Sequence, residues 1–256
     1  MPSRLLFLVI AGKILVLVAW ALGLTSTAVT IGLFFALGTL GLHHLFMPGA
    51  QGLGPVTTRF ATPRPEVWLT IDDGPDPEDT PRILDLLDRH RAHATFFLVG
   101  ERAAQHPELV SEIARRGHEI GNHTHTHPSA SFWCALPARV ARELDQAADA
   151  LRPATGAPPT RFRPPVGIKN FFLFPALVRR GLTCVGWSVR SGDTLRHRPE
   201  QVVEPVLRQV EPGAILLFHE GERLAPAVRV HALEGVLAGL DARGFRCVVP
   251  DAGQLR

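Results

Sequence analysis

The chain has 256 residues, with 27 Lys and Arg against 24 Asp and Glu and a formal net charge of +3. Its arginines are scattered and form no basic run with interleaved aromatic residues, which argues against a nucleic-acid partner. The three cysteines, Cys134, Cys184 and Cys247, are widely spaced and lack the pairing of a disulfide framework or a thiolate zinc site. They are therefore predicted to be buried apolar residues, in a chain that suits one medium-sized domain plus a short extra segment.

The first fifty residues form a separate apolar segment. Residues Leu5–Phe46 are almost entirely apolar, a run that no soluble domain needs. The run is too long for the core of a signal peptide, and no small-residue cleavage site is obvious before Pro48. The sequence therefore predicts a retained transmembrane anchor over residues 1–47, a location in a bacterial-type inner membrane, and membrane lipid as a partner.

Two arrangements of this anchor are compatible with the sequence. A hairpin has spans near Leu5–Leu24 and Ala28–Phe46, each close to the ~20 residues that cross the hydrocarbon core. It places Lys13 within a span, which costs about 2.5–3.5 kcal/mol of insertion free energy. It also returns the following domain to the same side of the membrane as the N-terminus. A single span near Ile14–Leu33 keeps Lys13 cytoplasmic and exports the domain. The hairpin is favoured slightly, because it uses all the apolar residues.

The rest of the chain alternates between strand and helix patterns. Residues 48–65 contain Gly, Pro, Gln and Thr with little apolar periodicity and are predicted to be a linker, followed by one domain over residues 66–256. Predicted strands are Val67–Ile71, Ala94–Val99, Glu119–Asn122, Arg161–Arg163, Thr183–Trp187, Ala214–Phe218 and Arg246–Val249. Predicted helices are Thr80–His90, Pro107–Arg116, Leu136–Leu151, Phe172–Arg180, Glu200–Val210 and Ala225–Arg243. About seven strand–helix units in one domain of this size favour an α/β fold with a distorted (β/α) barrel over an open doubly wound sheet.

Polar clusters follow the carboxyl ends of the predicted strands. They are Asp72-Asp73, His123 to His127, Arg163-Pro164-Pro165, Asp193 and His219. Residues at this end of barrel strands converge on one mouth, where barrel enzymes perform chemistry. No nucleotide-type glycine loop follows any strand.

The first two clusters together indicate a metal site. Adjacent Asp72 and Asp73 are costly as like charges unless a cation lies beside them, although a solvated turn is the alternative for this pair alone. If the backbone turns helically after Asn122, His123 and His127 share a face; if it stays extended, His125 joins them. The two histidines and one carboxylate predict a site with open positions for water and substrate.

The remaining clusters fit acid–base chemistry at the same mouth. Arg163 begins a rigid Pro-rich turn from which its guanidinium can hold a carboxylate in a fixed orientation. His219 ends an apolar strand beside the acidic Glu220. Taken alone, each motif also fits a plain surface loop or strand end.

Four motifs in this order carry a family resemblance. They are Thr70 to Pro75, His123 to His127, Arg163 to Gly167 and Leu217 to His219, and they resemble the polysaccharide deacetylases of the NodB-homology type, carbohydrate esterase family 4. Residues 94–100 are similar to the family's second strand. The resemblance covers the chain from Glu66 onward. It implies a distorted (β/α) barrel, a divalent metal that is usually zinc, with cobalt or another ion as an alternative, and hydrolysis of a carbohydrate acetyl group.

The resemblance also implies a role for each matching residue. Asp72 would be the general base, and Asp73, His123 and His127 would bind the metal, whereas His125 falls on a variable position. Arg163 would orient Asp72, and the amide of Val166 would face the oxyanion. Leu217 would line the acetyl pocket, and His219, tuned by Asp193, would be the general acid.

Three positions depart from the family pattern. Arg190 stands where an Asp is usual, Thr194 where a Trp is usual, and Val166 where an aromatic residue is common. Since these positions line the groove beside the metal, the departures concern substrate shape more than chemistry. The sequence thus predicts a groove without a flat aromatic wall for a long glycan.

The anchor narrows the predicted substrate. A catalytic mouth tethered to a bilayer meets membrane-associated sugars at high effective concentration, which favours an acetylated glycolipid or envelope polysaccharide. A deacetylase of peptidoglycan or chitin-like chains is the enzymatic alternative and requires export of the domain. An inactive membrane-anchored sugar-binding module is the non-enzymatic alternative, and it is disfavoured because base, metal ligands and acid are all present.

Overall fold

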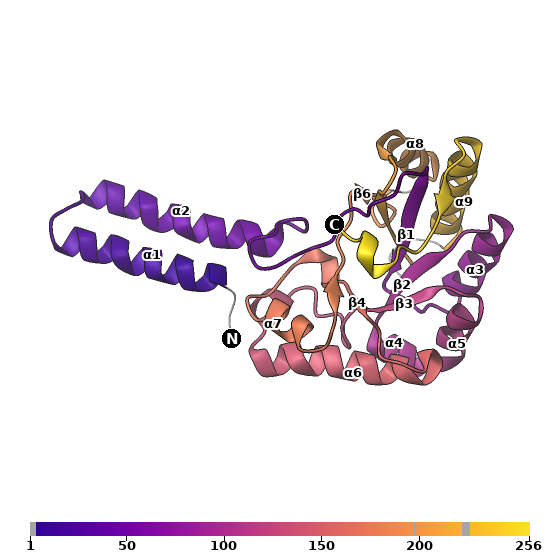
Figure 1. The fold of residues 1–256 in the computed structure, drawn as a ribbon, viewed down its shortest axis with the longest axis horizontal. Coiled ribbons are helices and arrows are strands. Elements are labelled where there is room, and N and C mark those ends of the chain that lie inside the picture. The colour runs from indigo at the N-terminus through magenta and orange to yellow at the C-terminus, as the bar shows by residue number, and fades with distance from the viewer. Residues whose placement is uncertain (1–3, 197, 222–225) are drawn as a thin grey trace.

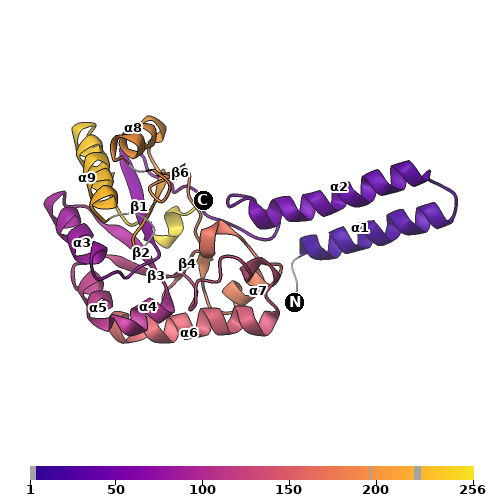
Figure 2. The same cartoon turned by 180° about the vertical axis from the view of Figure 1, so that it is seen from behind.

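The computed structural model describes residues 4–196, 198–221 and 226–256. It has two parts: a pair of N-terminal helices, α1 (Arg4–Ala21) and α2 (Thr27–Phe46), projects from an α/β body (Figure 1). The reverse view shows the same separation, with helices surrounding a curled sheet in the body (Figure 2).

The strands of the body form one parallel sheet. They are β1 (Glu66–Asp72), β2 (Ala94–Leu98), β3 (Glu119–Asn122), β4 (Arg161–Phe162), β5 (Thr183–Cys184), β6 (Val189–Arg190), β7 (Ile215–His219) and β8 (Arg246–Cys247). Seven of them follow the order β5-β4-β3-β2-β1-β7-β6, and β8 pairs with the start of β1. This curled half-barrel confirms the predicted α/β fold and distorted (β/α) barrel.

Helices connect the strands. The α-helices of the body are α3 (Asp79–Arg89), α4 (Gly100–Gln105), α5 (Pro107–Arg115), α6 (Pro137–Thr155), α7 (Leu173–Val178), α8 (Glu200–Gln209) and α9 (Pro226–Ala242). Short 3₁₀ turns cover Phe132–Cys134, Pro165–Gly167 and Ala252–Gln254. Every predicted strand and helix overlaps an observed one, although Ala225, the predicted start of the last helix, lies outside the described residues. The sequence missed α4 and β6, because six and two residues are too short to show a periodic pattern.

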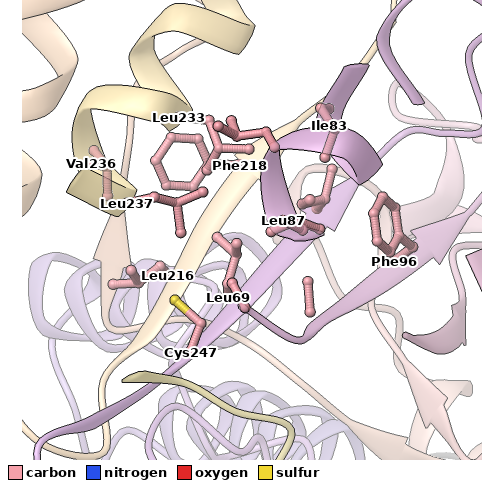
Figure 3. Packing of buried hydrophobic residues seen from close by; sticks show 14 of the residues in the cluster. Leu69, Ile83, Leu87, Phe96, Leu216, Phe218, Leu233, Val236, Leu237 and Cys247 are labelled. Carbon is pink, nitrogen blue, oxygen red and sulfur yellow. The ribbon is translucent and has the colours of Figure 1, made fainter. Parts of the chain in front are cut away.

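The alternation of β1 sorts its side chains between two environments. Leu69 and Ile71 belong to the large core between the sheet and its outer helices. Figure 3 shows Leu69 in this core together with side chains of α3 and α9. Trp68 points to the opposite face, where its indole N–H donates to Thr95 Oγ1 over 2.7 Å. Asp72 continues this second series and ends the strand, so the period of two delivers a carboxylate to the inside of the mouth.

The N-terminal helices form an apolar hairpin. Both are long and apolar enough to cross a membrane, and most of their side chains are exposed. The break between them, after Ala21 and before Thr27, falls inside the segment that the single-span alternative requires. Close packing uses small residues: a Cβ on Gly12 would lie 3.1 Å from Leu37. The Lys13 ammonium lies 4.3 Å from the centroid of the Phe34 ring, which gives this charge a partner within the hairpin.

The segment after α2 is packed against the body. Leu53, Val56 and Phe60 are buried, and Thr57 and Phe60 form isolated β-bridges with Val185 and Leu255. The segment predicted to be a linker therefore packs against the domain over much of its length.

The cysteines differ from their prediction at one position. Cys184 and Cys247 are buried, and burial raises the pKa of each thiol to about 12. Cys134 is exposed, because it lies on the 3₁₀ turn Phe132–Cys134, which turns Phe132 into the core and leaves Cys134 outside. The prediction of a buried residue was wrong for Cys134.

Candidate active site

Strand pairing brings the two ends of the predicted site together. In the parallel register of β1 and β7, Asp72 lies opposite His219. The register of β3 and β4 likewise aligns Asn122 with Phe162, so that the histidine loop after β3 and the Arg163 turn after β4 begin at the same level. The carboxyl ends of these strands form the single mouth that the sequence predicted.

Asp73, His123 and His127 form a group with the geometry of a metal site. One ligand atom from each residue lies within 4.8 Å of the others. Asp73 Oδ1 is 3.4 Å from His123 Nε2 and 3.1 Å from His127 Nε2. His123 Nδ1 lies 2.8 Å from the Arg163 carbonyl oxygen, an acceptor that requires the proton on Nδ1 and leaves the Nε2 lone pair facing Asp73. The donor set therefore fits a divalent cation.

His125 does not belong to this group. Its ring packs over Gly100, where an added Cβ would lie 2.6 Å from His125 Nδ1. Thr124 and His127 adopt φ values of 66° and 49°, so the loop turns after β3 instead of staying extended. The turn places His123 and His127 together and takes His125 to the other side.

The backbone of the site is held in an unusual conformation. Asp73 has φ of 76° and Val166 has φ of 50°, in the left-handed region that non-glycine residues rarely adopt. For β-branched Val166 this conformation is a strained one that the surrounding contacts must maintain. Residues in sparsely populated conformations cluster at functional sites, which supports a functional reading of both turns.

The charge of Asp73 is stabilised by its neighbours. Burial by itself raises the pKa of this carboxyl, but the hydrogen bond and charge of His123 and the charge of His127 bring it well below its usual value. Asp73 is therefore an anion at any physiological pH, as a metal ligand must be.

Arg163 holds the Asp72 carboxylate in place. Both side chains are buried, and Arg163 Nη1 donates to Asp72 Oδ1 over 2.7 Å and to Thr70 Oγ1 over 2.8 Å. The rest of the guanidinium donates to the carbonyl oxygens of Val185 and Gly186. With its position set by four hydrogen bonds, Arg163 holds one oxygen of Asp72, while Asp72 Oδ2 faces His123 Nε2 at 3.9 Å.

His219 is paired with Asp193. His219 Nδ1 lies 2.7 Å from Asp193 Oδ1, and the backbone N–H of His219 donates to Asp193 Oδ2 over 2.8 Å. Burial alone lowers the pKa of His219, but the charge and hydrogen bond of Asp193 outweigh it and raise the pKa above its usual value. The pair therefore favours the protonated form of the imidazole at the mouth.

Two adjoining cavities open at these residues. The smaller, of about 50 Å³, is lined by Asp72, Val166 and Leu217 together with the Asp73/His123/His127 group and His219. The larger, of about 240 Å³, shares Asp73, His127, Thr194 and His219 with it. All the positions where the sequence departs from the family pattern, Val166, Arg190 and Thr194, line the smaller cavity, and so does Trp187.

Two acidic residues that the sequence analysis did not assign support the site. Glu143 on α6 accepts hydrogen bonds from the backbone N–H groups of His125 and Thr126, at 3.0 and 2.9 Å. Glu220 is buried against the Asp73-Gly74 turn, and burial raises the pKa of Glu220 to about 8. The sequence holds one clue to each role. Glu143 is a carboxylate on the apolar face of a predicted helix, and Glu220 is a carboxylate next to His219.

Comparisons with known proteins agree with this geometry. The sequence profile of the polysaccharide deacetylase family matches residues 60–185. A chitooligosaccharide deacetylase of Bradyrhizobium sp. (strain ANU 289) is 39% identical over 70% of this chain and 86% of its own length. A peptidoglycan-N-acetylglucosamine deacetylase of Bacillus cereus is 34% identical over 76% of this chain and 91% of its own length.

Solved structures give the same result. A crystal structure of a peptidoglycan N-acetylglucosamine deacetylase superposes with a TM-score of 0.69 at 32% identity, covering 75% of this chain and 88% of that one. A family 4 carbohydrate esterase from Streptomyces lividans, in complex with acetate, superposes with a TM-score of 0.67 at 29% identity, covering 75% of this chain and 97% of that one. A pseudoenzyme of the same family from Bacillus anthracis superposes with a TM-score of 0.67 at 26% identity, covering 74% of this chain and 65% of that one. With its fold, its Asp/His/His group and relatives of this identity, the chain belongs to the polysaccharide deacetylase family, carbohydrate esterase family 4.

Proposed function

We propose that this chain, a hydrolase of the polysaccharide deacetylase family, removes acetyl groups from a sugar that is carried at a membrane surface. The observation that carries the chemistry is the meeting, at one cavity, of a buried Asp72, the Asp73/His123/His127 group and the His219–Asp193 pair. The observation that supports a membrane location is the apolar hairpin formed by α1 and α2.

A divalent cation, usually zinc with cobalt as an alternative, would be held by Asp73, His123 and His127 and would supply Lewis-acid polarisation of the acetyl carbonyl. Asp72, oriented by Arg163, accepts the proton of the attacking water. The backbone N–H of Val166 donates to the oxyanion as it develops, and Leu217 lines the space for the acetyl methyl group. His219, kept protonated by Asp193, delivers a proton to the departing sugar nitrogen, which is a poor leaving group without it.

The contacts of α2 support a membrane-associated substrate. The backbone N–H of Lys169 donates to the Leu45 carbonyl oxygen over 2.9 Å. On the same turn a Cβ on Gly167, next to Val166, would lie 2.8 Å from the Pro48 ring. The mouth therefore lies next to the end of α2, where residues 1–47 would leave the bilayer, and a sugar on a lipid carrier meets it at high effective concentration.

The relatives favour a second candidate substrate. Proteins 39% and 34% identical to this chain are named for chitooligosaccharide and for peptidoglycan, so the substrate class of the alternative is an oligomeric N-acetylglucosamine chain. The family includes a pseudoenzyme. An inactive sugar-binding module is nevertheless disfavoured for this chain, because base, ligand group and acid are all present.

Acetate release by the detergent-solubilised full chain tests this proposal. The protein is stripped with a chelator, restored with zinc or cobalt, and offered a panel of lipid-linked and oligomeric N-acetyl sugars. We expect metal-dependent release that Asp73→Ala abolishes, with a lipid-linked sugar preferred. Preference for free oligomers would favour the second candidate. No release from any substrate by folded, metal-loaded protein would contradict the enzymatic proposal.

A further inference from the structure

Exposed apolar side chains lie where the hairpin joins the body. They belong to Phe46, Met47, Trp133 and Leu136, whose exposed fractions are 40%, 51%, 39% and 70%. We refer to these four residues as the rim. Large apolar side chains exposed together in this way indicate a surface that has a partner.

The rim is continuous with the apolar hairpin. Phe46 is the last residue of α2, and its ring centroid lies 6.0 Å from that of Trp133. Leu5 at the start of α1 packs against the same buried cluster that contains Phe132 and Ala135, the residues on either side of the exposed Trp133-Cys134 pair. Both ends of the hairpin thus pack against the buried cluster to which Phe132 and Ala135 belong, since Leu45 near the end of α2 is also a member of it.

Buried polar contacts hold the rim in its exposed position. Asn170 Nδ2 donates to the carbonyl oxygens of Phe132 and Ala135, at 2.8 and 2.9 Å. Lys169 Nζ donates to those of Met47 and Pro48, at 2.5 and 3.0 Å. These hydrogen bonds fix the course of the backbone on both sides of the rim.

We propose that the rim lies in the headgroup region of the same bilayer that the hairpin spans, so that its partner is lipid. The proposal rests on the hairpin being a membrane anchor, as proposed above. Tryptophan is enriched at this depth because its ring is apolar and its N–H is polar, and Trp133 continues the apolar surface of α2 at its end. Because Val166 lies on the turn that packs against Pro48, a rim at this depth fixes the mouth at the membrane surface.

The three cysteines provide a direct measurement. Cys134 is exposed within the rim, whereas Cys184 and Cys247 are buried with raised thiol pKa values, so a nitroxide reagent labels the wild-type chain at Cys134. Two comparison sites are introduced in a Cys134→Ser background. Phe35→Cys reports on the middle of α2, where the side chain is 68% exposed. Ala157→Cys reports on the far end of the body, since the 19 residues of α6, about 28 Å, separate it from Leu136.

Electron paramagnetic resonance on the full chain in phosphatidylcholine–phosphatidylglycerol vesicles gives the depth of each label from its collisions with oxygen and with a water-soluble nickel complex. We expect the label at position 35 to lie deep, the label at 134 near the phosphates and the label at 157 in water. A label at 134 as aqueous as the one at 157, with position 35 deep, overturns the proposal and leaves the anchor intact. An aqueous label at position 35 contradicts the anchor itself. Spin–spin broadening at 134 would mean that a second copy covers the rim, which also overturns the proposal.

A charge in the rim provides a functional test. Leu136 is the N-cap residue of α6, a position that favours aspartate, so Leu136→Asp is compatible with the fold. We expect about tenfold slower turnover of an acetylated lipid-linked sugar in vesicles, on the order of 1.4 kcal/mol, with turnover of a soluble acetyl substrate unchanged. The matched control, Ala157→Asp, leaves both rates unchanged. Equal rates for Leu136→Asp and wild type in vesicles would contradict a lipid contact at the rim.

Discussion

Arg163 and Asp72 form a buried ion pair, with 2.7 Å between Nη1 and Oδ1, at the centre of the mouth. A buried pair of this kind holds its carboxylate in one orientation, and the removal of either partner leaves the other charge uncompensated. The guanidinium also lies 4.3 Å from the centroid of the Phe97 ring, so Arg163 is fixed by an aromatic contact as well as by hydrogen bonds. Asp72 thus has a fixed position from which it can accept a proton.

The first prediction concerns Asp72. Asp72→Asn keeps an oxygen acceptor for Arg163 but removes both the basicity and the negative charge of the buried pair. We therefore expect kcat to fall by about 10²–10⁴-fold and the melting temperature to fall as well, with little change in the far-UV circular dichroism spectrum at 25 °C. Turnover at saturating substrate and zinc affinity are measured together, because the proposed role requires a loss of the first without a comparable loss of the second. Wild-type turnover in the purified variant would exclude Asp72 as the base.

The second prediction concerns the pH dependence of His219. As general acid, His219 acts in its protonated form, and activity is lost as pH rises through its pKa. Asp193 raises this pKa, so Asp193→Asn is expected to lower it and to move the alkaline limb of the kcat profile to lower pH. The comparison variant is Asp251→Asn, since Asp251 is exposed and caps the last 3₁₀ turn of the chain. An unmoved alkaline limb in Asp193→Asn would assign that limb to another group.

The third prediction concerns Glu143, which holds the histidine loop without touching substrate. Its Oε2 accepts hydrogen bonds from two backbone N–H groups and its Oε1 accepts one from Thr126 Oγ1, and the negative charge strengthens all three. Glu143→Gln keeps one acceptor oxygen but removes this charge. We expect a 10–100-fold loss of zinc affinity, about the effect of removing an outer contact of a metal site, with kcat at saturating zinc much less affected. Competition with a chromophoric chelator measures the affinity.

The control for Glu143→Gln is Glu204→Gln, on the exposed face of α8, where the side chain is 77% exposed. Its zinc affinity should equal that of the wild type. If Glu143→Gln binds zinc as tightly as this control, the loop is positioned by the strand ends alone.

The sequence could predict the strand ends but not the contacts that brace them. The positions of Asp72, His123 and His219 follow from a simple rule, since the carboxyl ends of parallel strands share one edge, and the structure brings them together at one mouth. The turn that separates His125 from its neighbours depends on left-handed backbone at Thr124 and His127. Thr and His do not by themselves indicate a left-handed backbone conformation, so the sequence was compatible with both arrangements of the loop.

Other features depend on contacts between residues far apart in the chain. Lys169 is a charged residue in a loop, which sequence reasoning places in solvent, yet it is completely buried against residues more than 120 positions earlier. Residues 48–65 lack periodicity because their buried side chains Leu53, Val56 and Phe60 fill separate gaps along the body. No local pattern reports such packing, which explains why the segment was predicted to be a linker.

The last prediction concerns Lys169 and stability. Lys169→Met keeps the length of the side chain but leaves the Met47 and Pro48 carbonyl oxygens without their donor, so we expect a lower melting temperature in detergent at pH 7. The pH dependence gives a second signature. Burial lowers the pKa of Lys169 to about 8, against 10.5 for the unfolded chain. Between these values the unfolded state binds more protons than the folded one, so the wild-type chain gains stability from this residue as pH rises from about 8 to 10.5.

Lys169→Met lacks this gain, and the difference in melting temperature between wild type and variant should therefore widen between pH 8 and pH 10.5. Most other titrating groups are common to both proteins and cancel in the difference. Lys13→Met, which alters a lysine of the hairpin far from the body, serves as the control and should show no such widening. A constant difference for Lys169→Met across this range would mean that the ammonium keeps its proton when buried, and that the two carbonyl oxygens of the α2 end are bound by a full charge.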